Sequence, residues 1–462
     1  MQRLAPLERL VRSAHDRNRT LERGKDRGAM RTRRLALLAA LATTVALAVP
    51  ALAGAGNEVT KWNEIAVGTV NSQPALMSAP PAGAVFVAMV QGAVYGAVNA
   101  ADRHGRPYLV DRSYPKASAD AAAATAAYHV LNTLFPGSAA TLLTAYTASL
   151  AAIPAGDGKA QGIEVGELAA AAMLAEGHNS AVPIPCTFGT GGIGVWQPLP
   201  GATGPMCDPT VWVASAKPFL LESPSQFRTP GPYAVDSPEY AADYAEVKSI
   251  GKIDSVTRTS AQSHVAAFWN TNPAANYNAL ARRFVDQFSL DVSDSARLFA
   301  MLDLSAADTI INTWNDKYHY NFWRPITAIR RADDGNPATV SDGTWTPMFD
   351  PSLSPAIGGV GPALITPPYP DHVSGATAYA SASMHAFASF FGSDVMGTGF
   401  FLTSSRFPGE QRFFSRFSDV TAEILEARIW AGIHFRNADV QAADLGRNVE
   451  RYIHTHWFAA AH

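Results

Sequence analysis

Two cationic side chains, Lys317 and Arg324, lie seven residues apart in the segment KYHYNFWRP, with four aromatic residues between them. Seven residues are almost two turns of an α-helix, so we expect both cations on one helix face, with Pro325 ending or kinking that helix. Two cations held on one face repel each other unless an anion lies between them. The spacing favours an anion site, although cations whose stems lie along aromatic rings are also common at helix ends.

A second pattern that favours an anion lies in TPPYPDHVSGATAYASASMHAF, residues 366–387. The prolines stop at Pro370, and Ser374 and Gly375 then open an alanine-rich helix. The first turn of such a helix presents unpaired backbone N–H groups and the positive end of the helix dipole, and the Ser374 hydroxyl adds a donor. The alternative is an ordinary serine N-cap.

A third pattern lies in ARIWAGIHFRNAD, residues 427–439, where Arg428 precedes His434 by six positions. On a straight helix these two side chains would point about 120° apart. We therefore expect the helix to end near Gly432 and His434 to lie in a turn that Arg428 can reach. A histidine buried in the core is the alternative.

Taken together, three cations, a hydroxyl, a helix N-terminus and a histidine can surround a tetrahedral or trigonal-bipyramidal oxyanion. The motifs K-x6-R-P, S-G at a helix start and R-x5-H resemble the three-part signature of one superfamily. That superfamily joins the vanadium-dependent haloperoxidases to the type 2 phosphatidic acid phosphatases. The residues around the first and third motifs are similar to the bacterial secreted haloperoxidase-like branch.

This resemblance implies an all-α fold of helical bundles, with vanadate held at the mouth of the C-terminal half and phosphate able to occupy the same site. It implies that His434 binds the vanadium of vanadate, or attacks phosphorus in a phosphatase. The residues that it assigns to the oxygens of the anion are Lys317, Arg324, Arg428, Ser374 and Gly375.

The chain departs from the superfamily pattern at two positions. The motif P-S-G-H reads Val373-Ser374-Gly375-Ala376 here, so an alanine replaces the histidine that serves as the acid–base partner. We hypothesise that His372 supplies the proton function, with a polar turn residue as the alternative. Asp439 follows His434 by five positions instead of four, which leaves open the group that orients His434.

The resemblance favours a vanadate-dependent haloperoxidase that oxidises a halide, preferably bromide, with hydrogen peroxide and passes it to an organic acceptor. One alternative is a phosphomonoesterase that uses His434 as its nucleophile. The other is an oxyanion-binding protein without turnover, because the acid–base histidine is absent.

Hydrophobic periodicity and the scarcity of β-branched alternation predict an all-α chain. Residues 54–250 are expected to form an N-terminal helical region and residues 251–462 a C-terminal catalytic region. Two Pro/Gly-rich segments, 177–236 and 333–370, are expected to be irregular. The expected helices are 84–100, 118–134, 138–152, 160–176, 238–250, 257–270, 276–288, 293–322, 375–391, 408–431 and 438–458.

Residues 1–53 differ from the rest of the chain and end in a basic, then apolar, then Ala-x-Ala pattern. This layout is typical of a secretory signal, with Met30 as a possible start, cleavage near Ala53 and a secreted or periplasmic product. Cys186 and Cys207 would then be expected to form a disulfide. No later segment of about 20 residues lacks polar breaks, so we expect no membrane span.

The charge balance argues against nucleic acid as a partner. Residues 1–53 hold 11 basic and 4 acidic side chains, which leaves 25 basic and 35 acidic ones and a formal charge of −10 on the remainder. Nucleic-acid binding needs basic surface, so we expect small-molecule substrates instead.

Overall fold

The computed structural model describes residues 57–73, 80–180, 191–201, 204–205, 208–352 and 357–459. The expected signal peptide and both cysteines lie outside the described residues. Leu52–His462 form one compact unit. The expected division of this unit at residue 250 stays a prediction.

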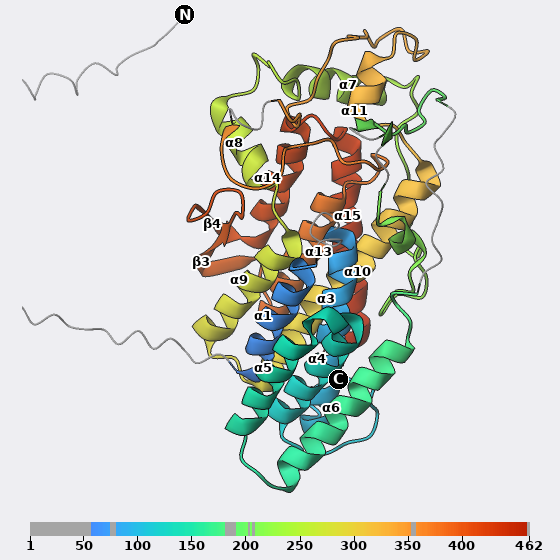
Figure 1. Ribbon diagram of the computed structural model, residues 1–462. Helices are drawn as coiled ribbons and strands as arrows, with labels where there is room; N and C mark the ends of the chain where they lie inside the picture. Colours follow the sequence, from blue (N-terminus) through green and yellow to red (C-terminus); the bar gives the residue numbers. More distant parts are fainter. Residues whose placement is uncertain are drawn as a thin grey trace, which may run out of the picture. The chain divides into compact units, whose positions relative to one another are not determined.

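The described part of this unit is mostly helical (Figure 1). Its α-helices are α1 (Glu58–Asn71), α3 (Pro80–Asp102), α4 (Ala119–Leu134), α5 (Ala139–Ala152), α6 (Asp157–Ala175), α7 (Pro238–Ile250), α8 (Ser260–Phe268), α9 (Pro273–Phe288), α10 (Val292–Tyr320), α11 (Pro325–Arg330), α13 (Gly375–Phe391), α14 (Phe417–Trp430) and α15 (Arg436–Ile453). The strands are β1 (Pro200–Gly201), β2 (Gly204–Pro205), β3 (Val395–Thr403) and β4 (Gln411–Arg416).

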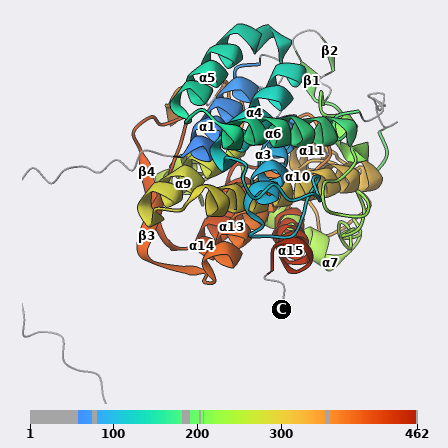
Figure 2. The same cartoon turned by 90° about the horizontal axis from the view of Figure 1, so that it is seen from below.

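Two groups of helices pack on a shared centre (Figure 2). Helices α4, α5 and α6 lie on one side, while α13, α14 and α15 lie on the other, and α3 and α10 run between them. Helix α10 packs against both α3 and α13. The all-α prediction is therefore confirmed. The α10–α13 contact brings the first two predicted motifs to one place.

Helix α10 ends earlier than the expected helix over 293–322. Its last residue is Tyr320, and Asn321 adopts a left-handed conformation with φ 47°, which asparagine tolerates better than most residues. Arg324 then precedes α11, with Pro325 at the first helical position. The prediction that Lys317 and Arg324 share one helix face is wrong, because a turn separates them.

The prediction of a helix over 408–431 is also wrong for the first part of that range. Residues 411–416 form β4, which pairs antiparallel with β3 in a hairpin, and α14 begins only at Phe417. Across the hairpin Phe400 lies opposite Phe414, and Phe401 opposite Phe413. Such aromatic cross-strand pairs stabilise a hairpin, whereas this segment has little apolar periodicity to stabilise a helix turn. The sequence analysis also missed α1.

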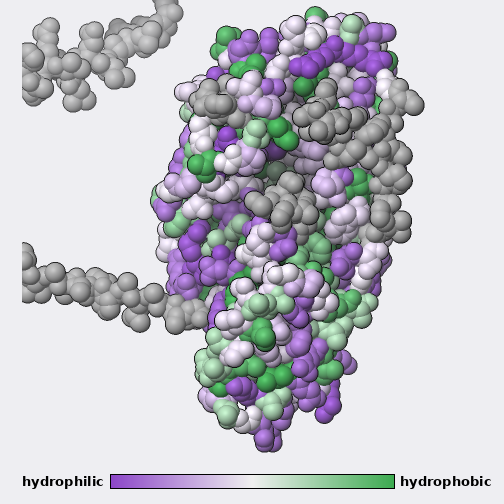
Figure 3. Space-filling view, viewed as in Figure 1, coloured by the Kyte–Doolittle hydropathy of each residue, from purple (hydrophilic) through white to green (hydrophobic). Residues whose placement is uncertain are grey.

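Helix α3 is long and apolar enough to cross a membrane, with a mean hydropathy of 1.5 over 18 residues. In the structure 94% of that window is buried against the rest of the unit, as in the core helix of a globular protein. Apolar residues also appear among polar ones on the lower surface in Figure 3, where α5 and α6 lie. Leu143 and Leu168 are the exposed large apolar residues of those two helices. Scattered exposure of this kind is ordinary for a globular surface.

A buried carboxyl group in α10 gives the fold a pH dependence. Asp303 is 1% exposed and accepts a hydrogen bond of 2.8 Å from Asn278, while its second oxygen has no partner among the described residues. Burial raises its pKa from 3.8 to about 7. The folded chain therefore keeps a proton that the unfolded chain loses, so this group lowers the free energy of unfolding as pH rises from about 4 to 7.

Replacing Asp303 by asparagine is expected to remove that pH dependence. As pH rises from 5 to 8, the unfolding free energy of the variant should increase by roughly 2–3 kcal/mol relative to that of the parent. Urea denaturation at the two pH values measures this gain. The control is Asp111→Asn, because the Asp111 side chain is 99% exposed. An Asp303→Asn gain no larger than that of the control would contradict the assignment.

Candidate oxyanion-binding site

The structure brings the predicted residues together from four helix ends. Lys317 lies in the last turn of α10, Arg324 at the start of α11 and Arg428 in the last turn of α14. Ser374 is the N-cap of α13, as predicted, and His434 lies between α14 and α15, as predicted. All are buried, with exposed fractions of 0% for Lys317, 1% for Arg324, 0% for Ser374, 7% for Arg428 and 2% for His434.

Lys317 is held by the loop that precedes α13. Its ammonium donates to the carbonyl oxygens of Pro370 and Asp371, at 2.8 and 3.0 Å, and lies 5.1 Å from the centre of the Tyr369 ring. Burial, and then the Arg324 guanidinium, lower the pKa of Lys317 well below its usual value. A buried cation beside another cation is stabilised by an anion in the same place.

Arg324 connects that loop to the His434 turn. Its Nε donates to the Tyr369 carbonyl oxygen at 2.8 Å, and its Nη1 donates to the Ile433 carbonyl oxygen at 2.7 Å. Nη1 also lies 3.1 Å from His434 Nε2. Nη2 is buried without a hydrogen-bond partner among the described residues. Since a buried guanidinium N–H without an acceptor is costly, this atom fits an oxyanion.

Arg428 presents a second donor of this kind. Its guanidinium lies 5.6 Å from the centre of the Phe349 ring, and its buried Nε has no partner among the described residues. Burial lowers the pKa of Arg428, while the Asp439 carboxylate raises it. Two orphaned guanidinium donors and a buried ammonium are the donor set expected for an anion with several oxygens.

The start of α13 is joined to α15 by a short polar chain. The Ser374 backbone N–H donates to the Ala438 carbonyl oxygen at 3.0 Å, and its hydroxyl donates to Thr377 Oγ1 at 3.3 Å. Thr377 in turn donates to Asp439 Oδ1 at 2.5 Å. Burial raises the pKa of Asp439 to about 7. Asp439 therefore positions the Ser374 hydroxyl through Thr377.

Gly375 leaves no room for a side chain. A Cβ there would lie 2.9 Å from the ring of Trp314, which is itself held by a 2.9 Å hydrogen bond from its Nε1 to Asp208. Replacing Gly375 by alanine is therefore expected to lower the unfolding free energy by roughly 1–3 kcal/mol and to weaken anion binding. Urea denaturation and vanadate titration measure the two effects. Gly137→Ala is the control, because a Cβ added there would have nothing within 4 Å. Equal effects of the two substitutions would contradict the prediction.

His434 lies against Asp371, a residue that the sequence analysis did not single out. His434 Nδ1 is 2.8 Å from Asp371 Oδ1, within ion-pair distance but without the alignment of a hydrogen bond. Burial, followed by the charges of Arg324, Lys317 and Arg428, lowers the pKa of His434 well below 6.5, so the ring is neutral. Nε2, which lies 3.1 Å from Arg324 Nη1, is then the nitrogen that can act as a ligand or nucleophile. Asp371 is the candidate for orienting His434, since Asp439 bonds to Thr377 instead.

The carboxyl group of Asp371 is itself strongly affected by the site. Its side chain is 1% exposed, and burial raises its pKa to about 8 even though Arg324 and Lys317 favour its charged form. Arg324 Nη1 lies 3.7 Å from Asp371 Oδ1. The signal that could have found Asp371 is its position: an acidic residue directly after a proline run and three residues before Ser374, the N-cap of the helix that forms the anion site.

His372 lies in the same loop and contacts a different residue, Thr229. It is 1% exposed, and its Nε2 lies 3.3 Å from Thr229 Oγ1. Burial, and then Lys317, lower its pKa to about 3. His372 and Asp371 both line a cavity of about 10 Å³, which has room for about one water molecule. The proton function of His372 stays a prediction.

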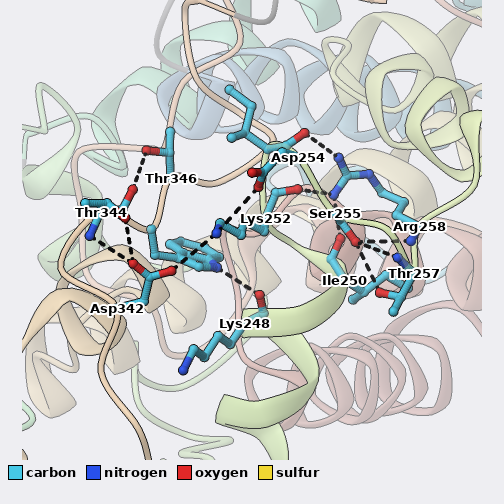
Figure 4. Close-up of polar contacts among 12 residues, drawn as sticks. Lys248, Ile250, Lys252, Asp254, Ser255, Thr257, Arg258, Asp342, Thr344 and Thr346 are labelled. Atoms are coloured by element: carbon cyan, nitrogen blue, oxygen red, sulfur yellow. Dashed lines mark hydrogen bonds and ion pairs between the residues drawn. The ribbon is translucent and has the colours of Figure 1, made fainter.

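The turn that carries His434 is fixed by the connection between α7 and α8. Gly432 has φ 76°, and a Cβ there would lie 2.4 Å from the Gly251 carbonyl oxygen, so only glycine fits. Arg258 Nη1 donates to the Lys252 carbonyl oxygen at 2.7 Å and to the Trp430 carbonyl oxygen at 3.4 Å. Figure 4 shows this connection, with Arg258 directed at the chain on either side of Gly251 and the Lys252 ammonium between Asp254 and Asp342.

Comparisons with known proteins agree with this geometry. The family model described as the VCPO second helical-bundle domain matches residues 297–460, which contain all the predicted anion-binding residues. The vanadium chloroperoxidase of Curvularia inaequalis is 29% identical over 119 residues, which are 24% of this chain and 18% of that protein. The chain thus matches less than a fifth of the length of this curated relative.

Two solved structures share the fold over most of their length. The first bacterial vanadium-dependent iodoperoxidase matches with a TM-score of 0.68 at 20% identity, covering 87% of this chain and 98% of that one. A holo-type bacterial vanadium-dependent chloroperoxidase matches with a TM-score of 0.62 at 19% identity, covering 86% and 97%. At these identities the matches establish the fold.

Proposed function

We propose that this chain, which belongs to the superfamily of vanadium-dependent haloperoxidases and type 2 phosphatidic acid phosphatases, is a vanadate-dependent haloperoxidase. The observation that carries the proposal is the pair of buried, unpartnered guanidinium atoms, Arg324 Nη2 and Arg428 Nε, beside the neutral His434 ring. Hydrogen-bond donors without acceptors beside a neutral imidazole suit an oxyanion of a Lewis-acidic metal, which would replace Arg324 Nη1 as the partner of His434 Nε2. The printed names of the similar proteins support vanadate as that oxyanion.

The residues of the site would have the following roles. Lys317, Arg324 and Arg428 would neutralise the oxygens of vanadate, with the Gly375 N–H as a further donor. The Ser374 hydroxyl, which donates to Thr377 here, would turn to the anion when it binds. His434 would bind through Nε2 while Asp371 holds its Nδ1. Vanadate, when bound, supplies the Lewis acid that makes hydrogen peroxide an oxidant for halide. His372 would accept and return the protons that peroxide and product exchange with the site.

We propose bromide as the preferred halide and an organic molecule as its acceptor. Chloride is the harder halide to oxidise, and its oxidation depends most on proton delivery. Ala376 stands where the superfamily has an acid–base histidine, so loss of that group should weaken chloride oxidation first. We further propose that the mature protein is exported, with the chain cleaved near Ala53.

A phosphomonoesterase is the second candidate, because the same donors and His434 would suit phosphoryl transfer. The buried Asp371 beside His434 Nδ1 favours this candidate as much as the first, since it would orient a nucleophile equally well. Without a general acid at Ala376, such an enzyme should prefer aryl phosphates, whose leaving groups need little protonation.

The test is a side-by-side assay of phosphate-free protein. Bromination of a phenolic dye by hydrogen peroxide, with and without orthovanadate, is compared with hydrolysis of an aryl phosphate. Bromination only with vanadate is the expected result. Aryl phosphate hydrolysis that vanadate inhibits, without bromination, would replace the proposal by the phosphatase. Vanadate binding without bromination and without aryl phosphate hydrolysis would indicate an oxyanion-binding protein.

A further inference from the structure

We infer that Thr229 and Asp316 form a hydrogen-bonded relay that takes protons from His372 and returns them. This inference rests on the proposed function, because it concerns the residue proposed to handle protons there. Thr229 and Asp316 do not touch the reacting atoms in this arrangement; they act through His372.

The relay begins at the Thr229 hydroxyl group, which has two partners. Thr229 Oγ1 donates to Asp316 Oδ2 at 2.7 Å and lies 3.3 Å from His372 Nε2. The Thr229 backbone N–H also donates to Asp316 Oδ2, at 3.1 Å. A hydroxyl has one hydrogen, and here it is directed to the carboxylate. The Thr229 oxygen can therefore only accept from His372, which places the imidazole proton on Nε2 and the lone pair on Nδ1.

The far end of the relay is the buried carboxyl group of Asp316. Its Oδ1 pairs with Arg228 Nη1 at 2.8 Å, and the Arg228 side chain is 28% exposed. Burial raises the pKa of Asp316, while the hydrogen bonds from Thr229, followed by the charge of Arg228, oppose that rise. Asp316 also immediately precedes Lys317 in α10, so the same helix end carries the anion site and the end of the relay.

The surroundings hold the His372 ring in this orientation. The ring stands perpendicular to that of Tyr320, with centres 5.3 Å apart, and the Tyr320 hydroxyl donates to the Thr229 carbonyl oxygen. The Gln441 side chain also acts on His372, but its two N–H hydrogens are donated to the Gly231 carbonyl oxygen and to Asn437 Oδ1, so they leave the Nδ1 lone pair free. The charged or titratable groups that act on His372 or Asp316 are Lys317, Arg228, His319, Tyr320 and His434.

Proton movement through these groups balances. His372 accepts one proton at Nδ1 and releases the proton of Nε2 to Thr229 Oγ1. Thr229 passes its own hydrogen to Asp316 Oδ2, which holds it as a neutral carboxyl group. One proton enters at His372 and one is held on Asp316, with no change in oxidation state. The reverse transfer returns the proton to His372 and restores the starting state.

The first test needs no vanadate and no turnover. The two ring nitrogens of His372 are assigned by ¹⁵N NMR of the full chain labelled at histidine, and the Nε2–H tautomer is the expected result. In Thr229→Val the signals should shift toward the other tautomer, and Thr229→Ser should restore them. A parent protein with the proton on Nδ1, or a Thr229→Val spectrum identical to the parent, would overturn the inference. This readout stands even if the protein does not oxidise halide.

The second test measures the pH dependence of turnover. Thr229→Val is expected to lower kcat for halide oxidation at least tenfold and to shift its pH profile, while KM for halide and the affinity for vanadate stay within about twofold. Asp316→Asn should act in the same direction, and Thr229→Ser should recover most of the activity. A Thr229→Val variant with the kcat and pH profile of the parent would also overturn the inference.

Discussion

Replacing His434 by alanine is expected to abolish vanadate-dependent halide oxidation, by at least a thousandfold in kcat. His434 Nε2 lies 3.1 Å from Arg324 Nη1 and His434 Nδ1 lies 3.4 Å from it, so this ring is the imidazole that faces the guanidinium groups of the site. Without it the three cations remain, so the variant should still bind an oxyanion through charge. Steady-state bromination and equilibrium dialysis with vanadate measure the two properties separately.

A matched control exists in α13. His385 is another partly buried histidine, ten residues after Gly375 on α13, whose Nδ1 lies 2.8 Å from the Ser381 carbonyl oxygen. His385→Ala should keep halide oxidation within about threefold of the parent. Equal activity of His434→Ala and His385→Ala would show that His434 is not the vanadium ligand.

Replacing Asp371 by asparagine is the second change with a large expected effect. The carboxylate lies 2.8 Å from His434 Nδ1 and 3.7 Å from Arg324 Nη1, so it sets the position and the tautomer of the imidazole. Removing a group in this role lowers metal affinity or activity by roughly 10–100-fold. We expect Asp371→Asn to lower vanadate affinity and kcat by that range, with the fold retained.

Asp303→Asn serves as the control for this change. Asp303 is also a fully buried carboxyl group, but it lies 14 residues before Lys317 on α10, about 21 Å along the helix axis. Asp303→Asn should change the pH dependence of stability as described above without changing vanadate affinity. An Asp371→Asn protein with the affinity and kcat of the parent would refute the orienting role.

The features that could be predicted from sequence are those that local chemistry determines. A glycine after Arg428 and a serine before a glycine-led helix indicate where chains turn, and the structure places His434 and Ser374 accordingly. The turn after Lys317 escaped prediction because tyrosine and histidine are compatible with a helix, and only Asn321, in its left-handed conformation, interrupts it.

The contacts that were missed depend on segments far apart in the chain. Asp371 meets His434 because the loop before α13 folds over the end of α10, where Lys317 donates to its carbonyl groups. Thr229 meets His372 across more than 140 residues. No local sequence pattern predicts either contact. Spacing within one segment predicted the kind of site, whereas the orienting groups required the fold.

The most direct test is reconstitution of phosphate-free protein with orthovanadate while the initial rate of bromide oxidation by hydrogen peroxide is recorded. We expect no activity without vanadate and a rate that rises to a plateau at one vanadate per chain. A folded protein that binds vanadate at this ratio and oxidises no halide at any concentration would contradict the haloperoxidase proposal.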